Sequence, residues 1–328
     1  MAAREERKMN IPNKINLAHL PTPLEKLKFR NKKFLIKRDD FTGLDFSGNK
    51  IRKLEYLLYR AKKRRAEIIF TCGGEQSNHC RATASAAARV GIKTKLFLWG
   101  DDSNNTEGNL FLDKMYGTEI SFLNKKNYNS VNEIMGEESE SLINKGKKVY
   151  VIPEGGSTVL GIWGYISFIK ELTEQVDLGK INGILSAAGS GGTAAGMLVG
   201  AALNKLKIKI YAVNVLYPKE VLWKKIIFLA EGVIEEYNLN CTIDESNLVI
   251  IDGYSKEGYK NISDNKVKLI ASLAKETGIL LDPTYTGKAF AAYYDKFLCK
   301  AKGNKVIFLH SGGLFGAFAK RGKYLGNL

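Results

Sequence analysis

The chain has 328 residues, 45% of them hydrophobic and 26% charged, and its formal net charge is +16. These fractions are typical of a globular protein, and the length predicts two domains or one large domain. No apolar run is long enough to cross a bilayer and residues 1–10 are polar, so we expect neither a membrane span nor a secretory signal. Met9 offers a second start, which would make residues 1–8 an extension or tag remnant, and we expect those residues to be disordered.

The cysteines and histidines indicate reduced thiols and no metal site. Cys72, Cys80, Cys241 and Cys299 form no CxxC pair, and the three histidines are scattered without a zinc-binding pattern. We therefore predict a cytoplasmic protein with free thiols and no bound metal.

The excess of basic residues is spread along the chain. Its densest cluster, at residues 60–65, falls at the predicted end of a helix, where cations complement the helix dipole. We interpret it as a solvated face, in preference to a phosphate-backbone site, and so expect no nucleic-acid partner. The basic field is nevertheless suited to attracting anionic ligands.

Strands and helices alternate in the first half of the chain. The predicted strands are 33–38, 66–71, 93–99, 119–123 and 148–152. Four helices are predicted. The first begins at about Ile51, and the second is an alanine-rich helix that ends at Arg89. The other two cover 110–116 and most of 127–145. A polar loop is expected at 101–108.

The second half repeats this order. Its predicted strands are 181–186, 207–215, a short extended segment at 248–251, and 305–309. Its predicted helices are 194–206, 222–237, 266–277 and a segment rich in alanine and tyrosine after Lys288, with an irregular loop at 252–265. Such alternation predicts open α/β sheets with right-handed crossovers and a ligand site at the carboxyl ends of the strands.

A candidate nucleophile lies in Ser47-Gly48-Asn49-Lys50, directly before the helix that begins near Ile51. The positive end of the helix dipole disfavours a cation there and eases loss of the lysine proton. A neutral lysine forms Schiff bases with aldehydes. From this stretch alone, a solvated surface lysine is the simpler interpretation.

A candidate anion site follows the strand predicted at 181–186. In Gly189-Ser190-Gly191-Gly192-Thr193 the backbone N–H groups, two hydroxyls and the start of a helix all favour a phosphate. The stretch lacks a P-loop lysine and GxGxxG spacing, so ATP and dinucleotides are disfavoured. The structural alternative is a tight strand-to-helix turn.

A Schiff-base lysine together with a separate phosphate cradle suggests pyridoxal 5′-phosphate. The chain resembles the fold-type II (tryptophan synthase β-like) pyridoxal-phosphate enzymes, and more narrowly the family of D-cysteine desulfhydrases and 1-aminocyclopropane-1-carboxylate (ACC) deaminases. The matching motifs occur in family order at 21–24, 37–40, 47–50 with 52–55, 76–79, 155–157, 189–193, 282–288 and 310–313. The ordered set is specific, although each motif is modest alone.

The resemblance implies roles for individual residues. Lys50 would carry the cofactor as a Schiff base, Asn78 would bond its 3′-oxygen, and Ser77 would contact the substrate carboxylate or assist proton transfer. The phosphate would be bound by Ala188, Gly189, Ser190, Gly191, Gly192 and Thr193. Tyr285 and, on weaker flanking matches, Tyr259 would flank the substrate. The alternative for both tyrosines is a packing role.

Two positions bear on the substrate. ACC deaminases carry Glu and Leu where this chain has Thr286 and Ser311. A small hydroxyl near the pyridine nitrogen suits an unprotonated ring, which is a milder electron sink adequate for β-elimination. Glu75 and Glu154 depart from the family pattern, and each acid is interpreted either as a substrate-selecting group or as a harmless acid at a helix start.

The resemblance implies an α/β fold of two open, twisted, mostly parallel sheets flanked by helices, in interleaved domains. We expect residues 1–50 and 155–328 to form the larger, cofactor-binding domain and residues 51–154 the smaller one, in a homodimer. The expected activity is α,β-elimination on a small amino acid, first D-cysteine, giving pyruvate, ammonia and sulfide. The alternatives are ACC deamination, a related racemase or dehydratase, and, from another class, a non-catalytic RNA-binding protein.

Overall fold

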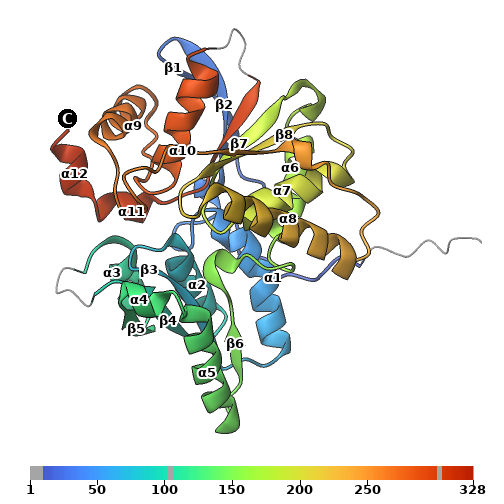
Figure 1. Cartoon of the computed structure of the whole chain (residues 1–328), viewed down its shortest axis with the longest axis vertical. Coiled ribbons are helices and arrows are strands. Elements are labelled where there is room, and N and C mark those ends of the chain that lie inside the picture. The colour runs from blue at the N-terminus through green and yellow to red at the C-terminus, as the bar shows by residue number, and fades with distance from the viewer. Residues whose placement is uncertain (1–9, 102–105, 301–304, 328) are drawn as a thin grey trace, which may run out of the picture.

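The computed structural model describes residues 10–101, 106–300 and 305–327, shown in Figure 1. The predicted disorder of residues 1–8 and half of the predicted polar loop at 101–108, residues 102–105, therefore lie outside the described residues. Two sheets form the framework, as predicted, and helices flank both.

The larger sheet has six strands in the order β1-β2-β10-β7-β8-β9. The strands are β1 (Leu24–Phe29), β2 (Lys32–Arg38), β7 (Gly183–Ala188), β8 (Lys209–Asn214), β9 (Leu248–Ile251) and β10 (Val306–His310). Only the β1–β2 pair is antiparallel. Strand β1 was not predicted, because its hairpin turns through Arg30 and Asn31, both at positive φ, without the glycine that usually signals such a turn.

The smaller sheet has four parallel strands in the order β5-β4-β3-β6. They are β3 (Ile68–Gly74), β4 (Lys93–Trp99), β5 (Glu119–Leu123) and β6 (Val149–Val151). Two small clusters, one around Phe70 and Phe97 and one around Leu96 and Leu98, pack its opposite faces against helices.

The helices mostly follow the predicted alternation, although the two short helices at the C-terminal end and one longer helix were not predicted. They are α1 (Asn49–Lys63), α2 (Asn78–Arg89), α3 (Gly108–Met115), α4 (Lys125–Tyr128), α5 (Val131–Asn144), α6 (Trp163–Thr173), α7 (Gly192–Leu203), α8 (Lys219–Glu236), α9 (Asp264–Thr277), α10 (Thr286–Tyr293), α11 (Leu314–Phe318) and α12 (Arg321–Leu325). Helix α1 begins at Asn49, not Ile51, which places Lys50 in its first turn. Helix α6 was not predicted, although its exposed residues Ser167, Lys170 and Thr173 recur every three residues opposite a buried face.

The core lies on both faces of the larger sheet. Alternate strand residues such as Ile184 and Ile307 pack against α1, α6, α7 and α8, while their neighbours Leu185 and Phe308 pack against α9 and α10. A sheet covered on both faces is typical of parallel strands. None of the described helices is long and apolar enough to cross a membrane.

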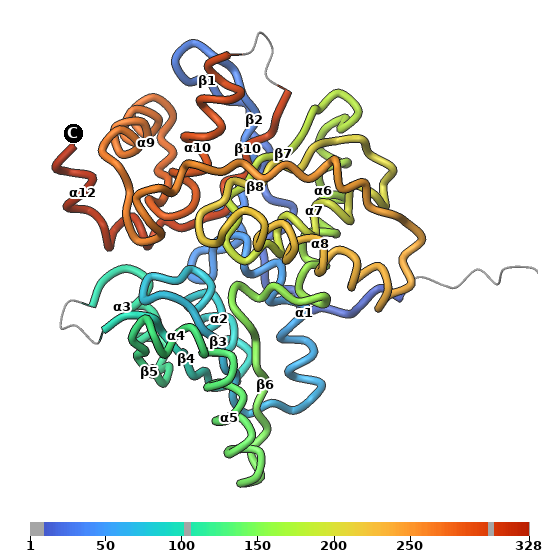
Figure 2. The backbone as a smooth tube through the Cα atoms, viewed as in Figure 1, coloured from blue at the N-terminus to red at the C-terminus, as the bar shows by residue number. Residues whose placement is uncertain are grey.

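The chain passes between the sheets twice. It starts in the larger sheet, enters the smaller sheet through α1 and returns after β6, as the colour sequence in Figure 2 shows. The exact boundaries at residues 50 and 155 stay a prediction.

A buried charge network fixes the start of α1 to the larger sheet. Arg52 donates to Asp39 (Nη2–Oδ1, 2.8 Å) and to Glu171 (Nη1–Oε2, 2.8 Å), and Lys37 donates to Glu171 (Nζ–Oε1, 2.5 Å). Two motifs noted in the sequence, 37–40 and 52–55, are thus held against each other. Because removing one partner would strand a buried charge, the network holds α1 in one position.

Candidate active site

The candidate site lies where strand ends from the two sheets meet. The turns after β3, β6, β7 and β10 all open into one region, as expected for ligand sites of parallel sheets. The space there that no atom fills, open solvent included, is about 440 Å³. Lys50, Asn78, Tyr285, Ser311 and residues 187–194 contribute to its wall.

Lys50 faces this cavity from the first turn of α1. Its ammonium group makes no hydrogen bond to any residue that the structure describes. Burial lowers the pKa of Lys50 to about 8, although the carboxylate of Glu154 opposes the shift. Neutral amine is therefore accessible near neutral pH, as a Schiff-base lysine requires.

The turn before Lys50 is shaped by a close approach of two backbone segments. Gly48 has φ +105°, and a Cβ there would lie 2.7 Å from the carbonyl oxygen of Ser311. The amide of Asn49 donates to that same carbonyl at 3.1 Å. Glycine is thus required at position 48, and Lys50 and Ser311 are held on adjoining walls of the cavity.

The stretch from Ala188 to Thr193 surrounds the other end of the cavity. Gly191 precedes α7, and the backbone N–H groups of the first turn of α7 are free of the helix ladder. A Cβ on Gly192 would lie 2.4 Å from Ser157 Oγ and 3.0 Å from Lys53 Nζ, so a side chain there would fill the cradle. Thr193 is held by Asn49, whose Nδ2 donates to Oγ1 at 3.0 Å.

Lys53 adds a cation that the sequence analysis did not assign. Its side chain is buried below this stretch and donates to Gly155 O at 2.9 Å and Ser157 Oγ at 3.1 Å. Desolvation, and secondarily the charge of Lys50, hold the pKa of Lys53 well below its usual range. The available signal was its place in the matched motif, one helical turn after Lys50.

Ser77 and Asn78 stand at the start of α2. Ser77 Oγ accepts from the amide of Cys80 at 3.2 Å and so caps the helix, which leaves its own proton free to donate. Asn78 lines the cavity, and its Oδ1 accepts from Asn109 Nδ2 at 2.9 Å.

Tyr285 and Tyr259 are brought together by tertiary structure. Their hydroxyls share a hydrogen bond, and Trp99 stacks on Tyr259 with 6.4 Å between ring centroids. Burial raises the pKa of both hydroxyls, so both keep their protons at neutral pH. Lys288 supports the pair, because its ammonium donates to the carbonyl of Gly258 at 2.7 Å, directly before Tyr259.

Ser311 lies in the cavity wall but Thr286 does not. Thr286 is fully buried, and its hydroxyl donates to Asp282 Oδ1 at 2.6 Å. Asp282 also accepts from the amides of Thr284 and Tyr285, both at 2.9 Å, and thereby sets the turn that presents Tyr285. No strand of the described residues directly precedes this turn.

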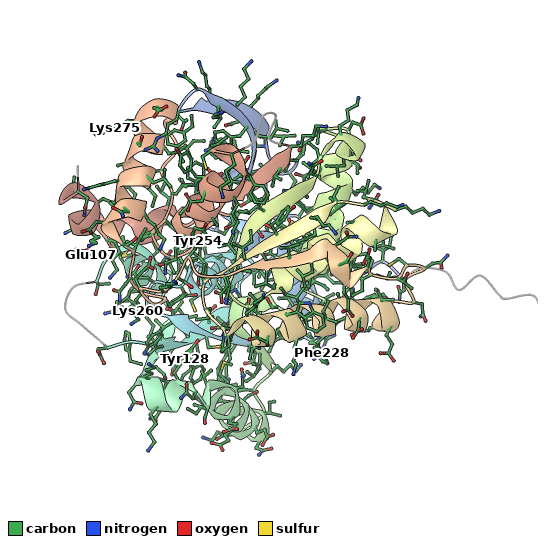
Figure 3. All side chains as sticks on the ribbon, turned by 45° about the horizontal axis from the view of Figure 1, so that its top comes forward. Glu107, Tyr128, Phe228, Tyr254, Lys260 and Lys275 are labelled. Carbon is green, nitrogen blue, oxygen red and sulfur yellow. The ribbon has the colours of Figure 1, made fainter. Side chains whose placement is uncertain are left out.

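The two unusual acids lie in different places. Glu154 lines the cavity beside Lys50, and its Oε2 accepts from the Tyr217 hydroxyl at 2.6 Å. Glu75 instead pairs with Lys260 at 3.2 Å, and Lys260 lies 4.4 Å from the centroid of the Trp99 ring. Lys260 and Tyr128 mark this side of the site in Figure 3.

The described residues fit pyridoxal phosphate. The Lys50 amine, which has no hydrogen-bond partner among them, suits an aldehyde. The glycine stretch, with buried Lys53 behind it, suits a phosphate. The Asn78 amide lines the same cavity and suits a ring oxygen. The described residues contain no cluster of three or more His, Cys, Asp or Glu arranged to hold a metal.

Comparison with known proteins identifies the family. The family described as pyridoxal-phosphate dependent enzyme matches residues 15–312. A putative ACC deaminase of Thermotoga maritima is 41% identical over 313 residues, covering 94% of this chain and 98% of the relative. A bifunctional D-cysteine desulfhydrase/ACC deaminase of Arabidopsis thaliana is 36% identical, covering 93% and 79%.

A solved structure described as an ACC deaminase homologue has 34% identity and a TM-score of 0.89, covering 97% of both chains. A hydrogen sulfide-producing enzyme from Fusobacterium nucleatum has a TM-score of 0.64 at 19% identity and covers 89% of this chain and 93% of that one, which shows a shared fold. The chain belongs to the family of pyridoxal-phosphate-dependent enzymes, in the group of proteins named ACC deaminase and D-cysteine desulfhydrase.

Proposed function

We propose that this enzyme removes the α-proton and then the β-substituent of a small amino acid, with D-cysteine as its first substrate and pyruvate, ammonia and hydrogen sulfide as products. When bound, pyridoxal phosphate supplies the aldehyde for a Schiff base and an electron sink for the charge left at the α-carbon. The residues of this chain bind and orient the cofactor and the substrate and transfer the proton.

Lys50 is the proposed attachment point and base. With a pKa of about 8, roughly a tenth of the amine is neutral at pH 7, which suffices for attack on an aldehyde. With substrate bound, the Lys50 amine in the cavity wall would be the group that takes the α-proton. Residues Ala188 to Thr193 bind the phosphate, and Lys53 supplies a countercharge.

Ser77 and the start of α2 are proposed to hold the substrate carboxylate. The Ser77 proton is free to donate, and unpaired N–H groups at a helix start favour an anion. Tyr259 and Tyr285 face the substrate from the other side. One of the two hydroxyls donates its proton to the other. The hydroxyl that accepts keeps its own proton, which it can donate to the substrate.

Ser311 is the observation that favours β-elimination. In the part of the cavity lined by Lys50, Asn78 and residues 187–194, none of the described residues carries a carboxylate, and Ser311 offers a hydroxyl, whereas Glu154 lines the adjoining part. A hydroxyl leaves the ring nitrogen unprotonated, which is adequate for expelling a thiolate but a weaker aid to opening a cyclopropane. The names of the relatives support ACC deamination equally, so it is the second candidate.

Glu154 supports a substrate without an anionic side chain. Its carboxylate stands in the wall of the cavity that also contains Lys50, Ser77 and Tyr259. A second negative charge there would be repelled without relief from solvent. D-cysteine, which carries a neutral thiol, avoids this cost.

The test compares kcat/KM for pyruvate from D-cysteine with kcat/KM for 2-oxobutanoate from ACC. We expect D-cysteine to be strongly preferred, since this ratio reports differential transition-state binding. Ser311→Leu should shift the ratio towards ACC, as should Thr286→Glu with Ser311→Leu, while the control Ser311→Thr, which keeps the hydroxyl, should not. Equal or better activity of the native enzyme on ACC would refute the D-cysteine assignment. Absence of a visible cofactor band would refute the enzymatic proposal altogether.

A further inference from the structure

The side-chain amide of Asn109 is fixed in one orientation by two independent contacts. Its Oδ1 accepts from Arg81 Nε at 3.1 Å, and its Nδ2 donates to the backbone carbonyl of Gln76 at 2.9 Å. A guanidinium only donates and a carbonyl only accepts, so a flipped amide would lose both bonds. Oxygen and nitrogen of Asn109 are therefore assigned by the chemistry of its neighbours.

This orientation determines the polarity of Asn78. The second proton of Asn109 Nδ2 points at Asn78 Oδ1, at 2.9 Å. With its oxygen engaged, Asn78 presents Nδ2 to the cavity, where that group has no hydrogen-bond partner among the described residues. The group that Asn78 offers to a ligand is thus a donor.

The contacts that hold Asn109 are buried, and they also connect to the loop before Lys50. Asn109 and Arg81 are both fully buried, so water does not compete for their bonds. Arg81 also donates to the carbonyls of Asp45 and Ser47, in the loop that leads to Lys50. One guanidinium therefore anchors both the Asn78 amide and the backbone before Lys50.

We propose that Asn109 is a positioning residue, which makes Asn78 a hydrogen-bond donor to the 3′-oxygen of pyridoxal phosphate. This rests on the proposed assignment of Asn78. A donor at that oxygen stabilises its ionised form and disfavours the neutral hydroxyl, because hydrogen bonding to a charged group favours the charged state. Asn109 would thus influence the cofactor without touching it.

The test is Asn109→Asp, which keeps the shape but removes the donor. An aspartate still accepts from Arg81, yet it can only accept from Asn78, so the Asn78 amide must turn its oxygen to the cavity. We expect the pH midpoint of the visible absorption titration of the holoenzyme to rise by about one unit, and pyridoxal phosphate to bind the apoprotein about tenfold more weakly. Asn109→Leu, of similar volume, should give a smaller change in the same direction and serves if the first variant does not fold.

Two comparisons decide the result. The matched control is Asn204→Asp at the far end of α7, where the lost amide bond goes to Gly200 O at 2.8 Å, and it should leave both readouts unchanged. In an Asn78→Ala background, Asn109→Asp should have no further effect, because the two residues act as one unit. An unchanged midpoint in both Asn109 variants, or additive effects with Asn78→Ala, would overturn the inference. An unchanged midpoint in Asn78→Ala alone would instead refute the assignment of Asn78 on which it rests.

Discussion

Lys53 is a buried cation without a carboxylate partner among the described residues, and its removal gives a sharp prediction. Its ammonium contacts only a carbonyl and a hydroxyl beneath the proposed phosphate-binding stretch, and desolvation lowers its pKa. We predict that Lys53→Met weakens binding of pyridoxal phosphate without destabilising the apoprotein. Methionine fills a similar volume and needs no countercharge.

The magnitude follows from the contacts. A hydrogen bond to a charged group contributes about 1.5–3 kcal/mol, so losing the one expected between Lys53 and the phosphate should weaken cofactor binding roughly ten- to hundredfold. For the apoprotein, replacing a poorly compensated buried charge is neutral or stabilising, by up to about 4 kcal/mol.

The pH dependence has a definite sign. The pKa of Lys53 is lower in the folded apoprotein than the ordinary 10.5, so the unfolded chain binds more protons between those two values. Stability of the apoprotein should therefore rise with pH across that window, and Lys53→Met should flatten the rise. Urea unfolding of both apoproteins between pH 7 and pH 10 measures this, and fluorescence titration with pyridoxal phosphate measures affinity.

Lys37→Met provides the contrast. Lys37 is also a buried lysine with a lowered pKa, but it is paired with Glu171 at 2.5 Å. Removing it leaves Glu171 with less compensation, so this variant should lose stability and keep its cofactor affinity. The reasoning would be refuted if Lys53→Met bound the cofactor as tightly as the native protein, or if both variants lost stability alike.

Three further changes test other parts of the site. Lys50→Ala should abolish turnover and the borohydride-reducible cofactor link while circular dichroism shows an intact fold; a retained link would identify another anchor. Glu154→Gln should lower the pKa of Lys50 below about 8, because an opposing carboxylate is lost, so the rate at which the apoprotein captures the aldehyde should reach half its maximum at a lower pH. Gly48→Ala should cost about 1–3 kcal/mol in chemical unfolding, because its Cβ would meet the Ser311 carbonyl at 2.7 Å; a variant as stable as the native protein would contradict this.

Local sequence patterns were sufficient for the architecture. Most strands and helices were predicted because buried parallel strands are apolar runs and helices repeat every three to four residues. Strand β1 was missed for a physical reason, because it closes on a turn that carries no glycine and so gives no local signal. Helix α6 was missed although it carries an exposed stripe opposite its buried face.

The sequence by itself determined the fold class, the cofactor family and the places to look for chemistry, because glycine turns, the lysine at a helix start and the motif order are properties of short segments. Only the tertiary structure decided which residues share the cavity. It brought Tyr259 to Tyr285, directed Glu154 to Lys50, turned the Thr286 hydroxyl to Asp282, and buried Lys53 against the carbonyl of Gly155. Burial and polarity of this kind depend on contacts between segments far apart in the chain, and no local periodicity encodes them.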